Sequence, residues 1–446
     1  MNARAMIDSG VEWIEEIPKD WALLRLKDVL TKNTGGAWGE DVSLYTQQEK
    51  TMVLRSTEQT LHGQWNIINP EFRFLSVNDK EKTRLEIGDI LITKSSGSSD
   101  HIGKATLVTE KEGNGAGYSN FMQRLRLKQN VLPYFIWRAI TSDMVRKQFV
   151  FLSNTTTGLA NLNATIIDKI YIVIPPYEEQ QSIADFLDHH VDLIDREAAL
   201  IDQKIELLGE KRKALIFECV TGKRTVVSRS SVADTHNAVG HGDLVAMPTD
   251  KEHMVDSGVE WIGDVPKDWE IQRLKDAGTW KTGKNPINQE IGDIPVYGSS
   301  SESFSSTMNF LDIGPAIAIG RKGTIDKPFE IKGPFWAVDT CMYNKIEKGI
   351  AYFDFVKYFM HVVPWVENST KTALPSLTQT QVSNIPLVIP NFILQKKIGN
   401  FLNNETTLID QEISLLKRKK DLLVEKRKAL IFEAVTGKID CRSWTA

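Results

Sequence analysis

The chain has 446 residues, 41% of them hydrophobic and 25% charged, with a formal net charge of −4. At this length two or three domains are expected, and the composition is that of a globular protein. No apolar run approaches the length of a membrane span and no basic-then-apolar leader opens the chain, so we expect a cytoplasmic protein without membrane contact. The weak net charge gives no overall sign of nucleic-acid binding, so any DNA contact must come from local clusters of Lys and Arg.

The opening segment, residues 8–29, places Trp13 and Trp21 on either side of Pro18. The same pattern returns 248 residues later, where Asp256-Ser-Gly-Val-Glu-Trp-Ile262 repeats Asp8 to Ile14. Aromatic residues that recur with a repeat are more often packing anchors than parts of a ligand cage. We therefore expect both tryptophans to pack inside the fold.

The first middle region, residues 30–174, is predicted to mix short strands with polar loops. Strands are expected over residues 85–94, from Gly103 through Val108, over 125–127 and over 170–174, with a helix over 134–149. A Thr/Asn/Gly loop covers residues 154–163. With no alternation of strands and long helices, this pattern favours an α+β domain.

A nine-residue stretch, Glu210 to Glu218, follows and recurs letter for letter as Glu425 to Glu433. The repeat stays in phase at 215 residues back to about Thr155 and Thr370. Apolar residues recur every seven positions from Leu187 to Leu215 and from Leu402 to Leu430, and a second row runs four residues later. Two such rows form the contact seam of a coiled-coil helix. A lone helix of this kind is marginal, so the two copies should pair antiparallel. Arg212, Arg427 and Lys420 on the seam could fix its register.

The second middle region repeats the outline of the first with different residues. Ala316 to Ile325 is predicted to be strand, basic turn and strand, with Lys94 and Lys104 of the first half in place of Arg321 and Lys322. A helix over 355–361, a polar loop over 370–378 and a strand over 386–389 follow. Before this region, residues 224–254 are rich in Ser, Asp, His and Gly and are predicted to be a flexible linker.

The predicted fold is therefore α+β, a tandem repeat with pseudo-twofold character in which two globular mixed domains are joined by two long antiparallel coiled-coil helices. Dissimilar middles on a shared frame suggest two recognition domains for different targets, held at a fixed separation. The predicted divisions are 1–176, first recognition domain; 177–223, first spacer helix; 224–254, linker; 255–390, second recognition domain; and 391–440, second spacer helix.

The whole chain resembles the specificity (S) subunit of type I restriction–modification systems. The resemblance rests on Ile174-Pro-Pro with Glu179-Gln180, on Ile183-Ala-Asp-Phe-Leu187, on the Gly-Glu-Lys-Arg-Lys-Ala-Leu stretch at 209–215 with its copy, and on the two Ser-Gly-Val-Glu-Trp openings. Gly88-Asp89 with Gly103-Lys104, and Val296-Tyr-Gly298 with Gly320-Arg-Lys-Gly323, look like the family's two target-recognition domains. The second copy departs from the first where Asn391-Phe-Ile-Leu replaces Pro176-Tyr-Glu-Glu.

This resemblance implies a bipartite double-stranded DNA target, with one half-site read by each recognition domain. It also implies that two methyltransferase (M) subunits dock on the helices and that translocase–endonuclease (R) subunits join them. Base edges are read by Arg and Lys at guanine and by Asn and Gln at adenine, while small polar loops approach phosphates. The candidate DNA contacts are Lys94, Ser95, Ser96, Lys104, Thr156, Thr157 and Asn161 in the first domain, and Tyr297, Ser299, Arg321, Lys322, Thr324, Lys371 and Thr372 in the second. For any single one, a solvated loop residue is the alternative.

No catalytic, metal or cofactor site is predicted. Asn69-Pro-Glu-Phe72 resembles an adenine-methyltransferase motif, but Glu71 replaces its second proline and no cofactor loop accompanies it. Gly113 to Gly117 lacks the helix that a phosphate loop needs, and His189-His190 has no further ligand at metal spacing. Three cysteines without CxxC spacing indicate a reducing compartment and no zinc knuckle. A coiled-coil scaffold that binds only proteins and a stand-alone nuclease or methyltransferase are the two alternatives to a non-catalytic specificity subunit.

Overall fold

The computed structural model describes residues 4–42, 50–96, 101–153, 162–231, 238–285, 291–347, 349–370 and 375–444. The chain divides into two compact units. The first unit comprises residues 1–200 and 419–446, and the second comprises residues 201–418. Each unit thus contains one mixed α+β lobe together with parts of both long helices.

The two long helices, α5 (Tyr177–Val220) and α8 (Phe392–Val435), have 44 residues each. Their starts follow proline, as predicted, and the start of α8 is capped by the side chain of Asn391, which accepts a hydrogen bond from the Leu394 amide at 3.0 Å. The sequence difference between the two copies at this point, Asn391-Phe-Ile-Leu in place of Pro176-Tyr-Glu-Glu, therefore changes only how the helix begins. Both helices end at a glycine in the left-handed region, Gly222 and Gly437, where only glycine is unstrained.

Ion pairs show that α5 and α8 run antiparallel in each unit. In the first unit Glu197 pairs with Lys419 at 2.7 Å, and in the second unit Lys204 pairs with Glu412, also at 2.7 Å. These four residues are two repeat-related pairs, because Glu412 and Lys419 lie 215 residues after Glu197 and Lys204. The seam leucines and isoleucines between the helices are largely buried. The predicted coiled-coil pairing is confirmed.

The end of each long helix packs on the opening segment of the other repeat. In the first unit Ile431 and Val435 of α8 share a core with Ile14 and Trp21. The indole of Trp21 also donates a hydrogen bond at 3.0 Å to buried Glu179. The second unit repeats this arrangement with Cys219 and Val220 of α5 against Val265 and Trp269. The opening tryptophans Trp21 and Trp269 are thus packing anchors, as predicted, and they anchor the other copy's helix.

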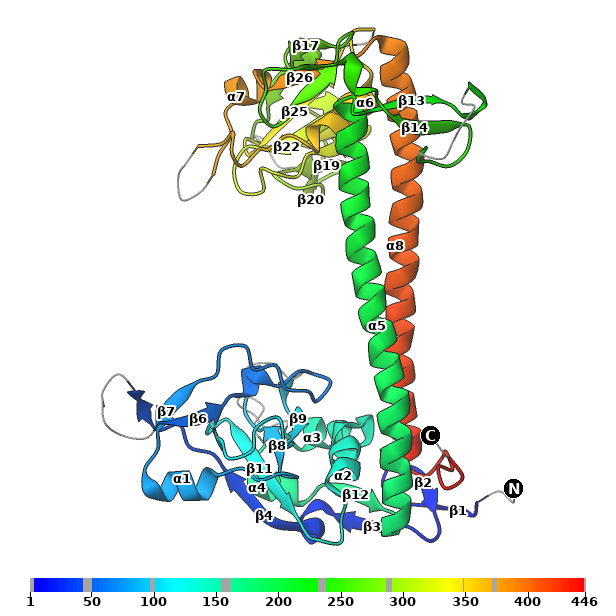
Figure 1. Ribbon diagram of the computed structural model, residues 1–446. Helices are drawn as coiled ribbons and strands as arrows, with labels where there is room; N and C mark the ends of the chain where they lie inside the picture. Colours follow the sequence, from blue (N-terminus) through cyan, green and yellow to red (C-terminus); the bar gives the residue numbers. More distant parts are fainter. Residues whose placement is uncertain are drawn as a thin grey trace. The chain divides into compact units, whose positions relative to one another are not determined.

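The lobe of the first unit contains two four-stranded sheets, in the orders β4-β11-β8-β9 and β10-β6-β7-β5, and two strand pairs, β1-β2 and β3-β12. In Figure 1, α2 and α3 lie between the first of these sheets and the start of α5. The strands are β1 (Met6–Asp8), β2 (Glu16–Pro18), β3 (Ala22–Arg25), β4 (Leu30–Gly35), β5 (Glu40–Asp41), β6 (Thr51–Leu54), β7 (Phe72–Phe74), β8 (Ile90–Thr93), β9 (Ala105–Leu107), β10 (Gly117–Tyr118), β11 (Met122–Leu127) and β12 (Tyr171–Ile174). The helices of this lobe are α1 (Val77–Thr83), α2 (Pro133–Thr141), α3 (Asp143–Ser153) and α4 (Ala164–Asp168).

The lobe of the second unit has a similar plan, with sheets β18-β25-β22-β23 and β20-β19-β24-β21 and the pairs β13-β14, β15-β16 and β17-β26. It differs in the β13-β14 hairpin and in its strand β21, which pairs with β24, the parallel neighbour of β19, whereas β5 of the first lobe pairs with β7, the antiparallel neighbour of β6. Its strands are β13 (Arg224–Ser228), β14 (Leu244–Pro248), β15 (Met254–Asp256), β16 (Asp264–Pro266), β17 (Glu270–Arg273), β18 (Gly278–Thr282), β19 (Ile294–Tyr297), β20 (Ser303–Thr307), β21 (Asp312–Ile313), β22 (Ala316–Gly320), β23 (Phe329–Ile331), β24 (Pro334–Ala337), β25 (Cys341–Ile346) and β26 (Pro386–Ile389). Its helices are α6 (Phe353–Met360) and α7 (Gln379–Ser383). The predicted α+β class is confirmed in both lobes.

Three local expectations differ from the structure. The single helix expected over 134–149 is broken at Ser142, whose extended ψ of 157° ends α2 before α3 begins. The second strand, expected to begin by Ile325 after the basic turn, begins only at Phe329, so the turn is longer than predicted. The segment expected to be a flexible linker contains the β13-β14 hairpin, which contributes buried Val226 and Ala246 to the core of the second unit.

Candidate nucleic-acid interface

The basic turn of the second unit is fixed by three main-chain hydrogen bonds. The Arg321 amide donates to the Thr340 carbonyl at 2.7 Å, and the Arg321 carbonyl accepts from the Leu377 amide at 2.9 Å. Beside it, the Val338 amide donates to the carbonyl of Tyr297 at 3.0 Å. These bonds bring together the end of β19, the end of β22 and the turn between β24 and β25.

The first unit contains the same frame. The Lys94 amide donates to the Phe121 carbonyl at 2.9 Å, and the Lys94 carbonyl accepts from the Leu162 amide at 2.8 Å. The Ser119 amide donates to the Leu54 carbonyl at 2.9 Å. Lys94 therefore occupies the position of Arg321, as the sequence predicted, and Leu162 lies 215 residues before Leu377.

A close backbone approach confirms that the two frames correspond. A Cβ atom added at Gly36 would lie 2.2 Å from the Tyr118 carbonyl oxygen and 2.3 Å from that of Ser119, and one added at Gly283 would lie 2.4 Å and 2.2 Å from the corresponding oxygens of Ala337 and Val338. Both positions therefore require glycine. We call Trp38 with residues 55–57, 94–96 and 119–121 the first cradle, and residues 297–299, 321–324 and 338–340 the second cradle.

The second cradle brings together five of the predicted contact residues. Tyr297 and Ser299 are half-buried at the end of β19, while Lys322 and Thr324 are exposed on the turn. Arg321 is half-buried and its guanidinium donates to the Asp339 carbonyl at 3.4 Å. The other two predicted residues of this unit, Lys371 and Thr372, lie outside the residues that the structure describes.

The first cradle brings together three of the predicted contact residues, Lys94, Ser95 and Ser96, all half-buried. Burial, with a smaller contribution from Lys82, lowers the pKa of Lys94. Among the described residues the Lys94 ammonium forms no ion pair. A cation without an internal carboxylate partner is available to an external anion such as a phosphate.

Lys104 has a different role from the one predicted. Its side chain is 6% exposed, and its ammonium donates hydrogen bonds of 2.8 Å to the carbonyls of Ser56 and Gln59. Burial, followed by the charge of Arg146, lowers its pKa. Lys104 therefore holds the loop after β6 in place instead of reaching a ligand. The remaining predicted residues, Thr156, Thr157 and Asn161, lie outside the described part of the chain.

Several cradle residues were not predicted from the sequence. In the first cradle they are Trp38, Arg55, Ser56, Thr57, Ser119, Asn120 and Phe121, which line one cavity with Ser95 and Ser96. In the second cradle they are Gly298, Gly323, Val338, Asp339 and Thr340. The sequence signal that could have found them is a short polar stretch between two strand-like runs, such as Ser119-Asn120. Sequence alone does not show that this stretch lies beside Lys94; the order of the strands in the sheet does.

The cradles differ in charge. The second cradle carries Arg321 and Lys322, and exposed Lys284 follows the neighbouring strand β18. In the first cradle the guanidinium of Arg55 is already bound by Glu58 at 2.8 Å and by Glu71 at 3.5 Å. The first cradle is therefore mainly aromatic and hydroxyl-bearing, whereas the second is cationic.

Comparison with known proteins assigns the family. The model of the type I restriction modification DNA specificity domain matches residues 18–207 and 266–423. The chain belongs to this family. The two matched segments follow the internal repeat, and the predicted resemblance to a type I specificity subunit is confirmed.

Similar proteins include the putative type I restriction enzyme MjaX specificity subunit of Methanocaldococcus jannaschii, 23% identical over 96% of this chain and 95% of that protein. The EcoKI specificity subunit of Escherichia coli K12 is 28% identical over 25% of each chain. Among solved structures, a chain from work on complex assembly and conformational transition of the type I restriction–modification system has a TM-score of 0.70 at 13% identity, covering 95% of this chain and 99% of that one. The HsdS subunit of Thermoanaerobacter tengcongensis has a TM-score of 0.53 at 14% identity, covering 97% and 100%. These structures share the fold of this specificity subunit.

The helices of this specificity subunit carry a second candidate surface, made of exposed leucines. Leu193, Leu200 and Leu207 are spaced seven apart on α5 and are 51%, 64% and 63% exposed. Their repeat mates Leu408, Leu415 and Leu422 on α8 are 42%, 67% and 63% exposed. Each leucine precedes a seam position by one residue, so each set lies along one flank of its helix. We call these two sets the leucine flanks.

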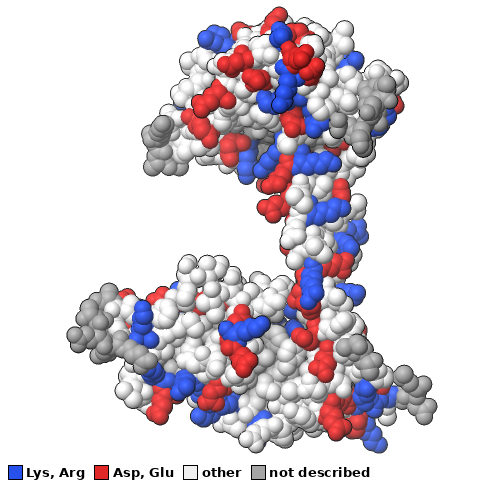
Figure 2. Space-filling model, in the orientation of Figure 1, with Lys and Arg blue, Asp and Glu red and all other residues white. Residues whose placement is uncertain are grey.

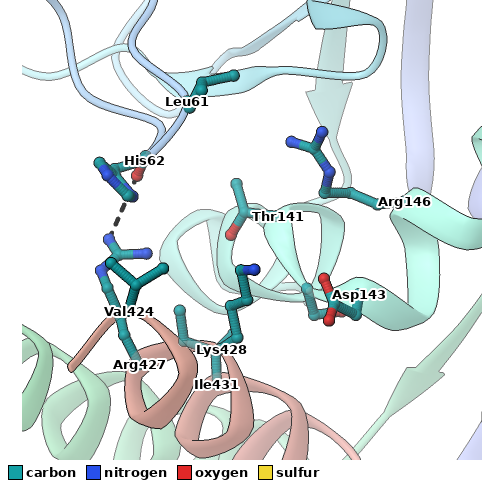
Figure 3. A pocket seen from close by; sticks show the side chains of 10 residues that line it. Leu61, His62, Thr141, Asp143, Arg146, Val424, Arg427, Lys428 and Ile431 are labelled. Carbon is teal, nitrogen blue, oxygen red and sulfur yellow. Dashed lines mark hydrogen bonds between the residues drawn. The ribbon is translucent and has the colours of Figure 1, made fainter. Parts of the chain in front are cut away.

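A basic cavity of about 340 Å³ lies where α8 meets the lobe of the first unit (Figure 3). Arg427 binds Asp195 of α5 at 3.0 Å and donates to the His62 carbonyl at 3.3 Å, so it joins both helices to the loop at residues 61–63. Lys428 lies across the cavity from Arg146 and pairs with Glu425 at 3.1 Å. Arg427 therefore stabilises the packing of α8 against α5 and against this loop.

The described residues contain no group of three or more His, Cys, Asp or Glu side chains arranged to hold a metal ion. Within the same part of the chain, no helix combines the length and the apolar character that crossing a bilayer requires. Cys219, Cys341 and Cys441 are free and buried, and burial raises the pKa of Cys341 and of Cys441 to about 12. These thiols are packing groups.

Proposed function

We propose that this specificity subunit binds a bipartite double-stranded DNA target, with each cradle reading one half-site. The observation that carries the proposal is the duplicated cradle, in which the main-chain frame is the same and the side chains differ. A common frame with different side chains suits two base sequences read in one manner. Because one chain carries both cradles, the second encounter is intramolecular and raises the overall affinity.

The chemistry of the two cradles suggests different half-sites. Arg321 can form the bidentate contact with guanine O6 and N7 that dominates major-groove readout, with Lys322 nearby for a phosphate. The first cradle, with its hydroxyls and aromatic rings, suits A·T-rich sequence, where thymine methyl groups offer apolar contacts. The proposed recognition domains keep the boundaries 1–176 and 255–390, with spacer helices at 177–223 and 391–440.

The proposed role includes assembly. The leucine flanks are apolar, exposed and related by the internal repeat, so they suit two copies of one partner, the methyltransferase subunit. Figure 2 shows Lys and Arg interleaved with Asp and Glu along the helices on the face in view. Such mixed charge gives little non-specific affinity for DNA and suits a protein partner. Restriction–translocase subunits would join this core in the cytoplasm, and the chain itself would supply no catalytic group, metal or cofactor.

The test is an exchange of residues 30–153 for the corresponding region of a related specificity subunit, followed by methylome sequencing of cells that also express the partner subunits. We expect one half of the methylated sequence to change and the other half to stay. A matched exchange of the second middle region should change the opposite half. Unchanged methylation after both exchanges, or methyl transfer by the isolated chain, would contradict the proposal.

The leucine flanks are tested separately. Leu200→Asp and Leu415→Asp should leave the fold intact, because both side chains are more than 60% exposed, and should abolish copurification of the methyltransferase subunit. Leu193→Ser, a milder change on the same flank, should weaken assembly less. Full assembly of the doubly substituted chain would show that the partner binds elsewhere.

A further inference from the structure

The first cradle lines a cavity of about 470 Å³. Most residues of the second cradle at the matching positions have different side chains. Its walls, among the described residues, are the rings of Trp38 and Phe121 and a set of short polar side chains that includes Ser56, Ser119 and Asn120. A volume of a few hundred Å³ with mixed apolar and polar walls is in the range of small-molecule sites.

The two aromatic walls are held in place. The guanidinium carbon of Arg73 lies 4.8 Å from the centre of the Trp38 ring, a cation–π contact that fixes the indole. Phe121 sits in the turn between β10 and β11, where its carbonyl accepts the Lys94 amide. Its side chain is 54% exposed, although nothing in the core requires an aromatic residue there. An exposed ring beside a cavity, on a backbone fixed by a hydrogen bond, suits stacking on a flat ligand.

Ser119 gives an independent indication of a ligand. Its side chain is 1% exposed, it lines the cavity, and its hydroxyl oxygen has no hydrogen-bond partner in the described part of the chain. Leaving a buried hydroxyl unsatisfied destabilises the fold, so such groups normally have a partner. The corresponding residue of the second cradle is Val338, so the hydroxyl is not needed to build the frame.

The charge of the cavity selects the kind of ligand. Arg55 is the cation in its lining, and Glu58 and Glu71 already neutralise it, so the cavity offers little attraction to a phosphate. Uncharged hydrogen-bonding groups between aromatic walls instead match the pockets that receive a base taken out of the DNA stack. Lys94, next to the cavity, is placed for the phosphate that flanks such a base.

We propose that the cavity of the first cradle receives a single nucleobase swung out of the duplex in the first half-site. The proposal rests on the proposed function, because it assumes that the first cradle faces DNA. Phe121 and Trp38 stack on the base, and Ser119 and Asn120 bind its polar edge. The second cradle, with Val338 in the place of Ser119 and Thr340 in the place of Phe121, reads its half-site with the bases left in the stack.

The experiment uses the full chain with its methyltransferase partners and a duplex that carries the mapped site. 2-Aminopurine replaces each purine of the first half-site in turn, and mismatches are introduced at every position. Because a methyltransferase flips its own target base, the methylated adenine should give a rise whatever the cavity does, and it is left out of the comparison. One further position should show a several-fold rise in 2-aminopurine fluorescence; if the displaced base is a pyrimidine, the purine next to it should show the rise. A mismatch at that position should tighten binding on the order of tenfold, because an unpaired base costs less to remove from the stack.

Variants separate the cavity from the rest of the cradle. Phe121→Ala and Ser119→Ala should each remove the fluorescence rise and the gain from the mismatch. Ile271→Ala, a change at a half-exposed position of β17 outside both cradles, should leave both signals intact. Circular dichroism checks that the variants are folded, and Phe121→Leu, which keeps the apolar bulk without the ring, should lose the signals if stacking produces them.

The outcomes for the two proposals differ. If the wild-type complex methylates its site while no position other than the methylated adenine gives a rise, and mismatches at all those other positions weaken binding, the base pocket is wrong and the proposed function stands. If the wild-type complex shows no site-specific DNA binding at all, the proposed function fails first. Retention of the signals in the Ser119→Ala and Phe121→Ala variants would place the displaced base elsewhere.

Discussion

The two cradles show how one backbone frame can carry two chemistries. Three main-chain hydrogen bonds and one glycine contact are the same in both units, within a few tenths of an ångström. The side chains on this frame differ: both cradles carry a cation, Lys94 or Arg321, but Ser119 and Phe121 of the first cradle are replaced by Val338 and Thr340 in the second. Backbone bonds need no particular side chain, so the frame survives while the contact surface changes.

The helices show the reverse, because identical residues have different surroundings. Arg212 and Arg427 belong to the same repeated stretch, and each binds an aspartate of the other helix at 3.0 Å. Arg427 also reaches the His62 carbonyl and its side chain is 9% exposed, whereas that of Arg212 is 30% exposed. A repeated sequence therefore guarantees the helix pairing but not equal contributions to stability.

The largest expected effect comes from charges placed in the seam. Leu208 and Leu423 are repeat mates and are 8% and 7% exposed. Leu208→Asp or Leu423→Asp should cost more than the roughly 2–5 kcal/mol of a buried Leu→Ala change, because a carboxylate is buried as well. Thermal unfolding followed by circular dichroism measures the loss. Leu207→Asp, at a neighbouring exposed position, is the control, and equal effects at Leu207 and Leu208 would contradict the seam.

The next largest effect is on DNA binding, when the cation at the same position of each cradle is removed. Arg321→Ala should cost about 1–3 kcal/mol at one base pair of the second half-site, since a bidentate contact is lost. Lys94→Ala should weaken binding evenly across sequences and lower the salt dependence by about one phosphate contact. Binding titrations of the assembled complex at several salt concentrations, on the mapped site and its single-base variants, measure both. Arg321→Lys keeps the charge and should still lose the discrimination.

A smaller effect separates the two seam arginines. Arg427→Ala should destabilise the chain by about 1–3 kcal/mol, because it leaves Asp195 and the His62 carbonyl without their partner. Arg212→Ala should cost less than about 1 kcal/mol, as expected of a more exposed ion pair. Denaturant unfolding of the two variants measures the difference. Equal losses would mean that the lobe contact at His62 contributes nothing.

The smallest effect concerns the exposed pairs that flank the seam. Hydrogen bonds from Lys419 and Lys204 lower the pKa of Glu197 and of Glu412. The stabilisation of the fold by these two ion pairs is therefore present at neutral pH and is lost as the pH falls through the lowered pKa values of the two glutamates. The melting temperature of the Glu197→Gln/Glu412→Gln variant should lie slightly below that of the unmodified chain at pH 7, and the gap should close in acid and in high salt. A gap that persists under both conditions would point to packing.

Local patterns in the sequence were sufficient to predict the helical pair and the two α+β lobes. Seven-residue spacing of Leu and Ile requires a partner helix, the repeat supplies it, and the glycines that end both helices are where the pattern placed them. The same reasoning located Lys94, Arg321 and Lys322 on turns after buried strands, because strands and turns depend on neighbouring residues. It failed at Ser142, whose hydroxyl bonds back to the Ala139 carbonyl where the predicted helix breaks. It also failed at the hairpin at Arg224–Pro248, whose Val226 and Ala246 pack in the core of the second unit.

Only the tertiary structure decided which turns share a cradle and what each charge does there. Lys94 and Lys104 look alike in the sequence. In the structure Lys104 is buried and bonded to two backbone carbonyls, whereas Lys94 remains available to an external anion. Trp38, Ser119 and Phe121 are far from Lys94 in the chain, and sheet order alone brings them to one cavity. Periodicity is a property of neighbouring residues, whereas a binding surface depends on which strands pair, and that pairing is set by the whole core.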